Sequence, residues 1–112
     1  MSLSLMPALQ FKRCFVPAIL DGTKTQTLRP RIRGDFSPGR TLSLFNGYRT
    51  DALIGRAIII DAVPVLLVDI TAEQAQLDGF ASREALLEAI AATYPDVTTF
   101  VAIRWRDFIP AR

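Results

Sequence analysis

The sequence predicts an α+β fold in which a small mixed or antiparallel β-sheet curls into a barrel. Several short segments alternate apolar and polar residues, which is typical of strands with one buried face. Strands and helices do not alternate regularly, because two helical segments, residues 71–78 and 82–93, follow each other directly. The chain has 112 residues, half of them apolar, which is enough for one well-packed domain. We therefore expect a single domain over residues 1–112, with residues 1–10 as a poorly structured lead-in.

The first predicted elements are a short helix and a strand. Residues 15–20, "FVPAIL", favour a helix because proline is tolerated in a first turn. Gly22 follows it and suits a left-handed C-terminal cap. Residues 25–29 alternate β-branched side chains, which predicts a strand, and Pro30 ends it.

The middle of the chain favours further strands. Residues 41–45, "TLSLF", alternate and predict a strand, and the dipeptide Asn46-Gly47 is a strong turn signal. Residues 53–68 are rich in isoleucine and valine but contain Pro64. Proline is disfavoured inside a sheet, so this segment predicts either two strands or one long strand broken by a bulge near Pro64.

The second half predicts two helices and then a strand. Thr71 has the properties of an N-cap residue, with Gln74 at the capping-box position. Ser82 begins the next helix, which follows helical apolar spacing to about Thr93. Residues 98–108 form the clearest strand pattern.

Composition excludes several kinds of chemistry. Histidine is absent and Cys14 is the only cysteine, so histidine-based catalytic triads, internal disulfides and cysteine or histidine zinc sites are excluded. We expect no metal and no organic cofactor. A single thiol fits a reducing, cytoplasmic location. The most apolar stretch, residues 57–70, is interrupted by charges and proline and is shorter than the about 20 residues of a membrane span, and residues 1–10 do not resemble a secretory signal.

Charge is distributed unevenly along the chain. Residues 1–56 hold nine basic and three acidic residues, whereas residues 57–112 hold four basic and eight acidic residues. A basic half predicts an anionic partner such as RNA or a nucleotide. The alternative is that folding interleaves the two halves and cancels the field.

One short segment combines the residue types of a candidate site, in the spacing Gly22-x-Lys24-x-x-Thr27-x-Arg29. Thr27 and Arg29 share one face of the predicted strand, and Lys24 lies at the turn before it. A neutral lysine beside a threonine hydroxyl can activate a nucleophile without histidine, and both burial and Arg29 would lower the lysine pKa. The alternative is a solvated edge strand on which lysine and threonine face water.

This segment carries a resemblance to a known family. Residues 19–29, "ILDGTKTQTLR", resemble the Gly-x-Lys-x-x-Glu-x-Arg signature of the ASCH domain, a branch of the PUA-like superfamily. The segments "FSPG" and "TLSL" near residues 36–44, and the layout from residue 69 to 105, are also similar to that family. The resemblance covers residues 11–106 and implies a PUA-like barrel with a short N-terminal helix and two helices before the last strand.

The signature differs at one position, where Thr27 replaces the usual glutamate. This change resembles the bacterial subgroup that hydrolyses N(4)-acetylcytidine with a lysine proton acceptor, a threonine nucleophile and a glutamate proton donor. The resemblance assigns the first two roles to Lys24 and Thr27. It assigns the third to Asp78, whose side chain is one methylene shorter than glutamate, with Glu73 as the other candidate. An alternative for Asp78 is an ordinary helix end.

The resemblance and the residue types together predict a ligand site. The implied reaction is acyl transfer to water, with backbone N–H groups near Gly22 or Arg29 as oxyanion donors. The residues expected to bind substrate or nucleic acid are Gly22, Arg29, Arg31, Asn46, Tyr48 and Arg49. A basic loop around Arg31 and a hairpin tip at residues 46–49 are the structural alternatives. Two other functions use the same cleft: a non-catalytic module that binds RNA or nucleotides, and RNA cleavage.

Two further residues are predicted to be structural. Trp105 alternates with apolar neighbours, which indicates core packing rather than stacking on a base. Cys14 precedes a helix and is expected to be a small buried residue.

Overall fold

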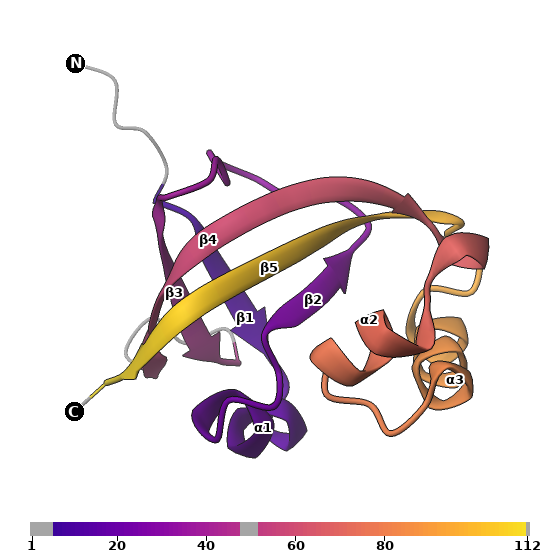
Figure 1. Cartoon of the computed structure of the whole chain (residues 1–112), viewed down its shortest axis with the longest axis horizontal. Helices are drawn as coiled ribbons and strands as arrows, with labels where there is room; N and C mark the ends of the chain where they lie inside the picture. Colours follow the sequence, from indigo (N-terminus) through magenta and orange to yellow (C-terminus); the bar gives the residue numbers. More distant parts are fainter. Residues whose placement is uncertain (1–5, 48–51, 112) are drawn as a thin grey trace.

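The computed structural model describes residues 6–47 and 52–111 and contains one five-stranded sheet (Figure 1). The strand order is β1-β3-β4-β5-β2, and all neighbouring pairs are antiparallel except the parallel pair β1–β3. The strands are β1 (Ala8–Phe11), β2 (Gln26–Arg29), β3 (Thr41–Asn46), β4 (Leu53–Leu66) and β5 (Thr99–Pro110). The predicted α+β class with a small mixed sheet is therefore confirmed.

The described residues also form five short helical segments. They are the 3-10 turns η1 (Arg13–Phe15) and η2 (Leu67–Asp69) and the α-helices α1 (Val16–Leu20), α2 (Ala72–Leu77) and α3 (Arg83–Thr93). Figure 1 shows β4 and β5 as a long curved pair, with α2 and α3 gathered near one of its ends. None of these described helices is long and apolar enough to cross a membrane.

The two edge strands of the sheet, β1 and β2, are joined by a side chain. Arg29 on β2 donates a hydrogen bond from Nη2 to the Gln10 carbonyl oxygen on β1, at 2.6 Å. The guanidinium also lies over the Phe11 ring, 4.9 Å from its centroid. Arg29 therefore helps to close the curved sheet at the place where β1 and β2 approach each other.

The predicted lead-in over residues 1–10 is wrong for its last three residues. Ala8–Phe11 forms β1, and Leu9 is buried and paired with Leu44 of β3. A four-residue strand carries little local signal, because its stability comes from the partner strand that only the folded sheet provides.

The predicted break near Pro64 is also wrong. β4 is one continuous strand, and Pro64 pairs in register with Val101 of β5. The register shifts lie earlier, between Arg56 and Ile58 and between Ile59 and Asp61. Pairing with β3 extends only to Ile58, so Pro64 lies at an open edge of the sheet, where its missing N–H costs no ladder hydrogen bond.

The core has two parts, and β5 contributes to both. One cluster, inside the curved sheet, includes Ile103 and Trp105 of β5, and Trp105 is buried as predicted. The other, between the sheet and the helices, includes Phe100 and Ala102 from the opposite face of β5. Cys14, in contrast, is exposed, so the prediction that it is buried is wrong.

The predicted N-terminal caps of α2 and α3 are confirmed. The Thr71 hydroxyl accepts a hydrogen bond from the Gln74 N–H, and the Gln74 side chain accepts one from the Thr71 N–H, which completes a capping box. Ser82 caps α3 by accepting from the Ala85 N–H. These bonds satisfy N–H groups that have no partner within a helix.

Replacing Thr71 with alanine tests the importance of the α2 cap. The variant is expected to lower the free energy of unfolding by about 1 kcal/mol, the usual cost of losing an N-cap hydroxyl. Urea unfolding followed by circular dichroism measures the change, with Thr71→Ser as the matched control that keeps the hydroxyl. An unchanged midpoint in Thr71→Ala would show that α2 does not depend on its cap.

Candidate active site

Four polar side chains are buried among the described residues. They are Lys24, Gln26, Thr27 and Asp78, each at most 6% exposed. The first three belong to the turn before β2 and to β2 itself, and Asp78 follows α2. The alternative in which lysine and threonine face water on an edge strand is therefore wrong.

The turn before β2 lies against the C-terminal end of α2. The last carbonyl groups of a helix have no partner inside the helix, and here residues 24 and 25 donate to two such groups. Gln26 adds a second bond to Gln74 O, which also accepts from the Asp78 N–H. The bonds run from Lys24 Nζ to Asp78 O (2.7 Å), from the Thr25 N–H to Leu77 O (2.8 Å) and from Gln26 Nε2 to Gln74 O (3.2 Å). Side chains that are about fifty residues apart in sequence are thereby fixed next to each other.

Lys24 is held by three acceptors. Its Nζ donates to Gln26 O at 3.0 Å, to Asp78 O at 2.7 Å and to Asp78 Oδ1 at 2.5 Å. Two aromatic rings also face the nitrogen, with the Phe15 centroid at 4.9 Å and the Phe11 centroid at 5.7 Å. Three donated bonds are the full complement of an ammonium group.

Burial dominates the electrostatics of this pair. Loss of hydration lowers the pKa of Lys24, although the attraction of Asp78 opposes the shift, and the Arg29 charge lowers it further. Loss of hydration likewise raises the pKa of Asp78, against the opposing effect of Lys24. Burial thus favours the neutral form of each group, and the two groups are in direct contact at 2.5 Å.

Thr27 lies beside this pair on the same strand face as Arg29. Its Oγ1 accepts a hydrogen bond from Arg29 Nε at 3.4 Å. Within the described part of the chain, Lys24 Nζ makes no hydrogen bond to the Thr27 hydroxyl, because its three protons point to other acceptors. The two groups meet instead at a shared cavity.

That cavity has a volume of about 560 Å³ and is lined by Lys24, Thr27, Arg29 and Asp78. This volume lies within the usual range for small-molecule sites. Its walls are mainly apolar and include α3 and the aromatic side chains of Phe11, Phe15, Phe80 and Tyr94. A largely apolar cavity is therefore shared by Lys24, Thr27, Arg29 and Asp78.

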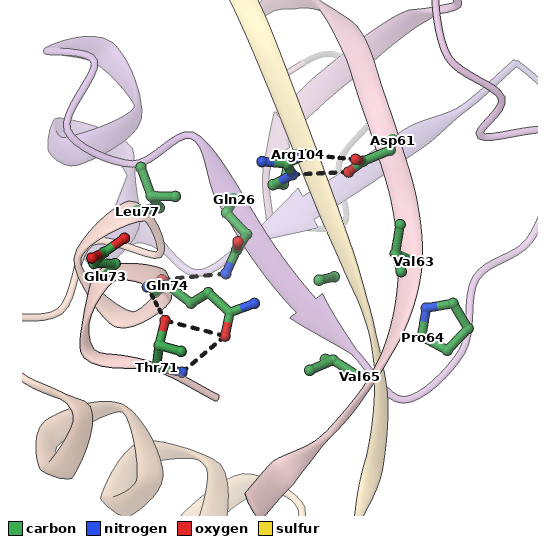
Figure 2. A pocket seen from close by; sticks show the side chains of 11 residues that line it. Gln26, Asp61, Val63, Pro64, Val65, Thr71, Glu73, Gln74, Leu77 and Arg104 are labelled. Atoms are coloured by element: carbon green, nitrogen blue, oxygen red, sulfur yellow. Dashed lines mark hydrogen bonds and ion pairs between the residues drawn. The ribbon is translucent and has the colours of Figure 1, made fainter. Parts of the chain in front are cut away.

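Glu73, the other candidate for the acid, lies elsewhere. It is exposed and lines a second cavity of about 360 Å³, beside α2, β4 and β5 (Figure 2). An ion pair between Arg104 and Asp61, with bonds of 2.9 and 2.6 Å, also lines that cavity. The fold thus brings Asp78 to Lys24 and leaves Glu73 apart from it.

The structure does not bring every predicted binding residue into the larger cavity. Gly22, Arg31 and Asn46 do not line it. Gly22 is the residue after the α1 cap, with φ of +84°, and its N–H donates to Ile19 O at 3.3 Å rather than toward a ligand. Tyr48 and Arg49 lie outside the described residues. Ligand binding by these five residues stays a prediction.

Three residues of the site were not predicted from the sequence. Phe15 and Phe80 form an edge-to-face pair in the cavity wall, with centroids 5.9 Å apart. Gln26 supplies its carbonyl oxygen to Lys24 and its side chain to α2. For Gln26 a signal exists, because a polar residue between Lys24 and Thr27 on a strand must point to the opposite face, which here is covered by helices. The two phenylalanines carry no such signal.

Two curated proteins are similar to this chain over nearly its whole length. A curated N(4)-acetylcytidine amidohydrolase from Shewanella baltica (strain OS223) is 31% identical over 102 residues, which are 91% of this chain and 95% of that protein. A second one, from Edwardsiella ictaluri (strain 93-146), is 28% identical over 99 residues, 88% of this chain and 91% of that protein. No family model matches the chain.

The solved structures agree on the fold. The crystal structure of ASCH from Zymomonas mobilis matches with a TM-score of 0.74 over 94% of this chain and 69% of that chain, at 17% identity. The half-closed mixed sheet and the α-helices of the described residues therefore define the ASCH class of fold. Within that class, the chain belongs to the N(4)-acetylcytidine amidohydrolase family.

Proposed function

We propose that this protein is an amidohydrolase that removes the acetyl group from N(4)-acetylcytidine or a related acylated nucleoside, with Thr27 as nucleophile. The observation that carries the proposal is the buried Lys24–Asp78 pair, which lines the same cavity as the Thr27 hydroxyl. The curated relatives carry the name of this activity over nearly their whole length. The proposed nucleophile, base and acid are all side chains that line this cavity.

The reaction begins with proton transfer from Lys24 to Asp78, which gives a neutral amine and a carboxylic acid. Lys24 Nζ then turns from the Gln26 carbonyl to Thr27 and takes the hydroxyl proton as Thr27 Oγ1 attacks the amide carbonyl carbon. Arg29 Nε, which donates to this oxygen, favours the developing alkoxide. In the structure without substrate, Lys24 Nζ still donates to Gln26 O. Catalytic hydrogen bonds often form only once the substrate is bound.

Collapse of the tetrahedral intermediate breaks the carbon–nitrogen bond. Asp78 donates its proton to the exocyclic nitrogen, so cytidine leaves and an acetyl ester remains on Thr27. Water then attacks the ester and gives its proton to the Asp78 carboxylate, while the Lys24 ammonium returns a proton to Thr27 Oγ1. Acetic acid leaves and ionises to acetate in water, and return of the proton from Asp78 to Lys24 restores the ion pair of the free structure.

Turnover by the wild-type protein tests the reaction itself. Incubation with N(4)-acetylcytidine is expected to release cytidine and acetate in equal amounts, as measured by liquid chromatography. A folded protein that releases no cytidine but binds RNA in a salt-sensitive way would contradict the proposal. That outcome would favour the non-catalytic RNA-binding alternative.

Thr27 variants test the nucleophile. Thr27→Val keeps the shape of the side chain and removes the hydroxyl, so kcat is expected to fall by at least about 10³-fold. Thr27→Ser keeps the hydroxyl and is expected to retain measurable turnover and to form an acetyl ester detectable by mass spectrometry. Substantial activity in Thr27→Val would remove threonine as the nucleophile.

A further inference from the structure

Gln26 is the fourth buried polar side chain, and the mechanism above does not use it. The side chain is completely buried, at 0% exposure. Strand alternation directs it to the face of β2 opposite Thr27, and it lines the smaller cavity rather than the one that holds Thr27 (Figure 2). Any effect of this side chain on the reaction is therefore exerted through its neighbours and not by contact with the substrate.

Gln26 bonds to Lys24 and to the helix that precedes Asp78. Its carbonyl oxygen accepts the 3.0 Å hydrogen bond from Lys24 Nζ. Its side-chain Nε2 donates to Gln74 O in α2 at 3.2 Å, one turn before Asp78 (Figure 2). Among the described residues, Asp78 Oδ2 is buried without a hydrogen-bond partner, so the carboxyl group is held by the Lys24 bond to Oδ1 and by the position of the α2 end that carries it.

We propose that Gln26 is a positioning residue that holds the end of α2, and with it the Asp78 carboxyl group, at the correct place beside Lys24. This inference rests on the proposed function, because it concerns the same reaction. A buried amide is suited to this task, because its N–H group donates to α2 and it does not titrate. An apolar residue of the same length fills the space but cannot bond to the Gln74 carbonyl.

The groups around Asp78 set the direction in which its pKa, and with it the pH dependence of the rate, is expected to change in a Gln26 variant. The charged groups that act on Asp78 are Lys24, from the turn, and Arg29, from β2; both lower its pKa, against burial, which raises it. The Gln26 amide also lowers the pKa of Asp78. Removing the amide therefore raises this pKa. Asp78 must be protonated to act as the acid, so the fall in rate at high pH moves to higher pH.

The test is Gln26→Met, which keeps the length of the side chain and loses the amide. We expect kcat for N(4)-acetylcytidine to fall by about 10- to 100-fold, because a small misplacement of a catalytic group has effects of this size. KM is expected to stay within about twofold, and the basic limb of the kcat profile to move to higher pH. A Gln26→Met enzyme with wild-type kcat and an unchanged pH profile overturns the proposal.

Thr71→Ala is the matched control, because it weakens the same helix at its other end. It is expected to lower stability and to leave kcat and the basic limb unchanged. If Thr71→Ala shifts both as Gln26→Met does, Gln26 has only a structural role. Should Gln26→Met fail to fold, Gln26→Asn is the second variant, because it retains the amide on a shorter side chain. The proposal requires its kcat to be lower than that of wild type but still measurable.

A measurement without substrate separates this inference from the proposed function. The ¹³C carboxyl shift of Asp78 is followed by NMR as a function of pH in wild type and Gln26→Met. The pKa of Asp78 is expected to be higher in the variant, whether or not N(4)-acetylcytidine is turned over. An unchanged Asp78 titration overturns the role of Gln26, whereas absent cytidine release with a shifted titration overturns only the proposed substrate.

Discussion

Lys24→Met is expected to abolish turnover and to lower the free energy of unfolding by about 3 to 5 kcal/mol near neutral pH, the usual cost of removing one partner of a buried ion pair. Lys24 is 1% exposed and makes the ion pair with Asp78. Without it, Asp78 is left in a site that already raises its pKa through burial. Urea unfolding and cytidine release measure the two effects.

The stability effect depends on pH with a definite sign. In Lys24→Met the pKa of Asp78 is raised further, because the effect of Lys24 that lowers it is gone. A folded-state pKa above the unfolded value gives stability that is fully present below the unfolded pKa of about 3.9 and lost as pH rises through the folded pKa. The deficit relative to wild type should therefore be smaller at pH about 5 than at pH about 8.

The double variant Lys24→Met/Asp78→Leu separates stability from chemistry. It removes both charges, so it is expected to recover most of the lost free energy of unfolding while turnover stays absent. A double variant that regains no stability would contradict a buried ion pair at this place. A Lys24→Met protein as stable as wild type at neutral pH would contradict it as well.

Gly55→Ala is expected to have the second large effect, a loss of about 3 kcal/mol in the free energy of unfolding. Gly55 lies in β4 between Leu44 and Pro110 of the neighbouring strands. A Cβ at this position would lie 2.3 Å from the Ile109 carbonyl oxygen and 2.6 Å from the Phe108 ring. Because the first of these atoms belongs to the backbone, β4 and β5 must move apart.

Gly39→Ala is the matched control for the clash. Gly39 has a φ of +89°, and a Cβ there meets no atom within 4 Å. Alanine should therefore cost only the strain of a left-handed backbone, about 1 kcal/mol. Thermal unfolding of both variants gives the comparison, and equal losses would show that the close approach at Gly55 is not what requires glycine there.

Much of the fold could be predicted because its signals are local. The capping box at Thr71, the cap at Ser82 and the alternation in β5 each depend on residues within one segment. The strand β1 and the unbroken course of β4 could not be predicted this way. Both depend on the partner strand: β1 needs β3, and Pro64 is accepted only because its outer edge is unpaired.

The candidate site divides in the same way. The spacing of Lys24, Thr27 and Arg29 predicted their grouping, because residues two or three apart on a turn and strand cannot separate far. The position of Asp78 required the resemblance to a family, since no local pattern brings a helix end to a strand across 54 residues. The aromatic walls and the bond from Gln26 to α2 depend on which elements pack against β2, so their partners could not be predicted from one segment.

The separation of 54 residues between Lys24 and Asp78 also bears on how the protein folds. The segment between them contains β3 and the whole of β4. Contacts of such long range form only after the loop between them has been closed, which costs chain entropy before any interaction is gained. No contiguous piece of the chain that stops before α2 can hold the pair. Recovery of activity during refolding should therefore follow the slowest step of assembly and not the earlier appearance of secondary structure.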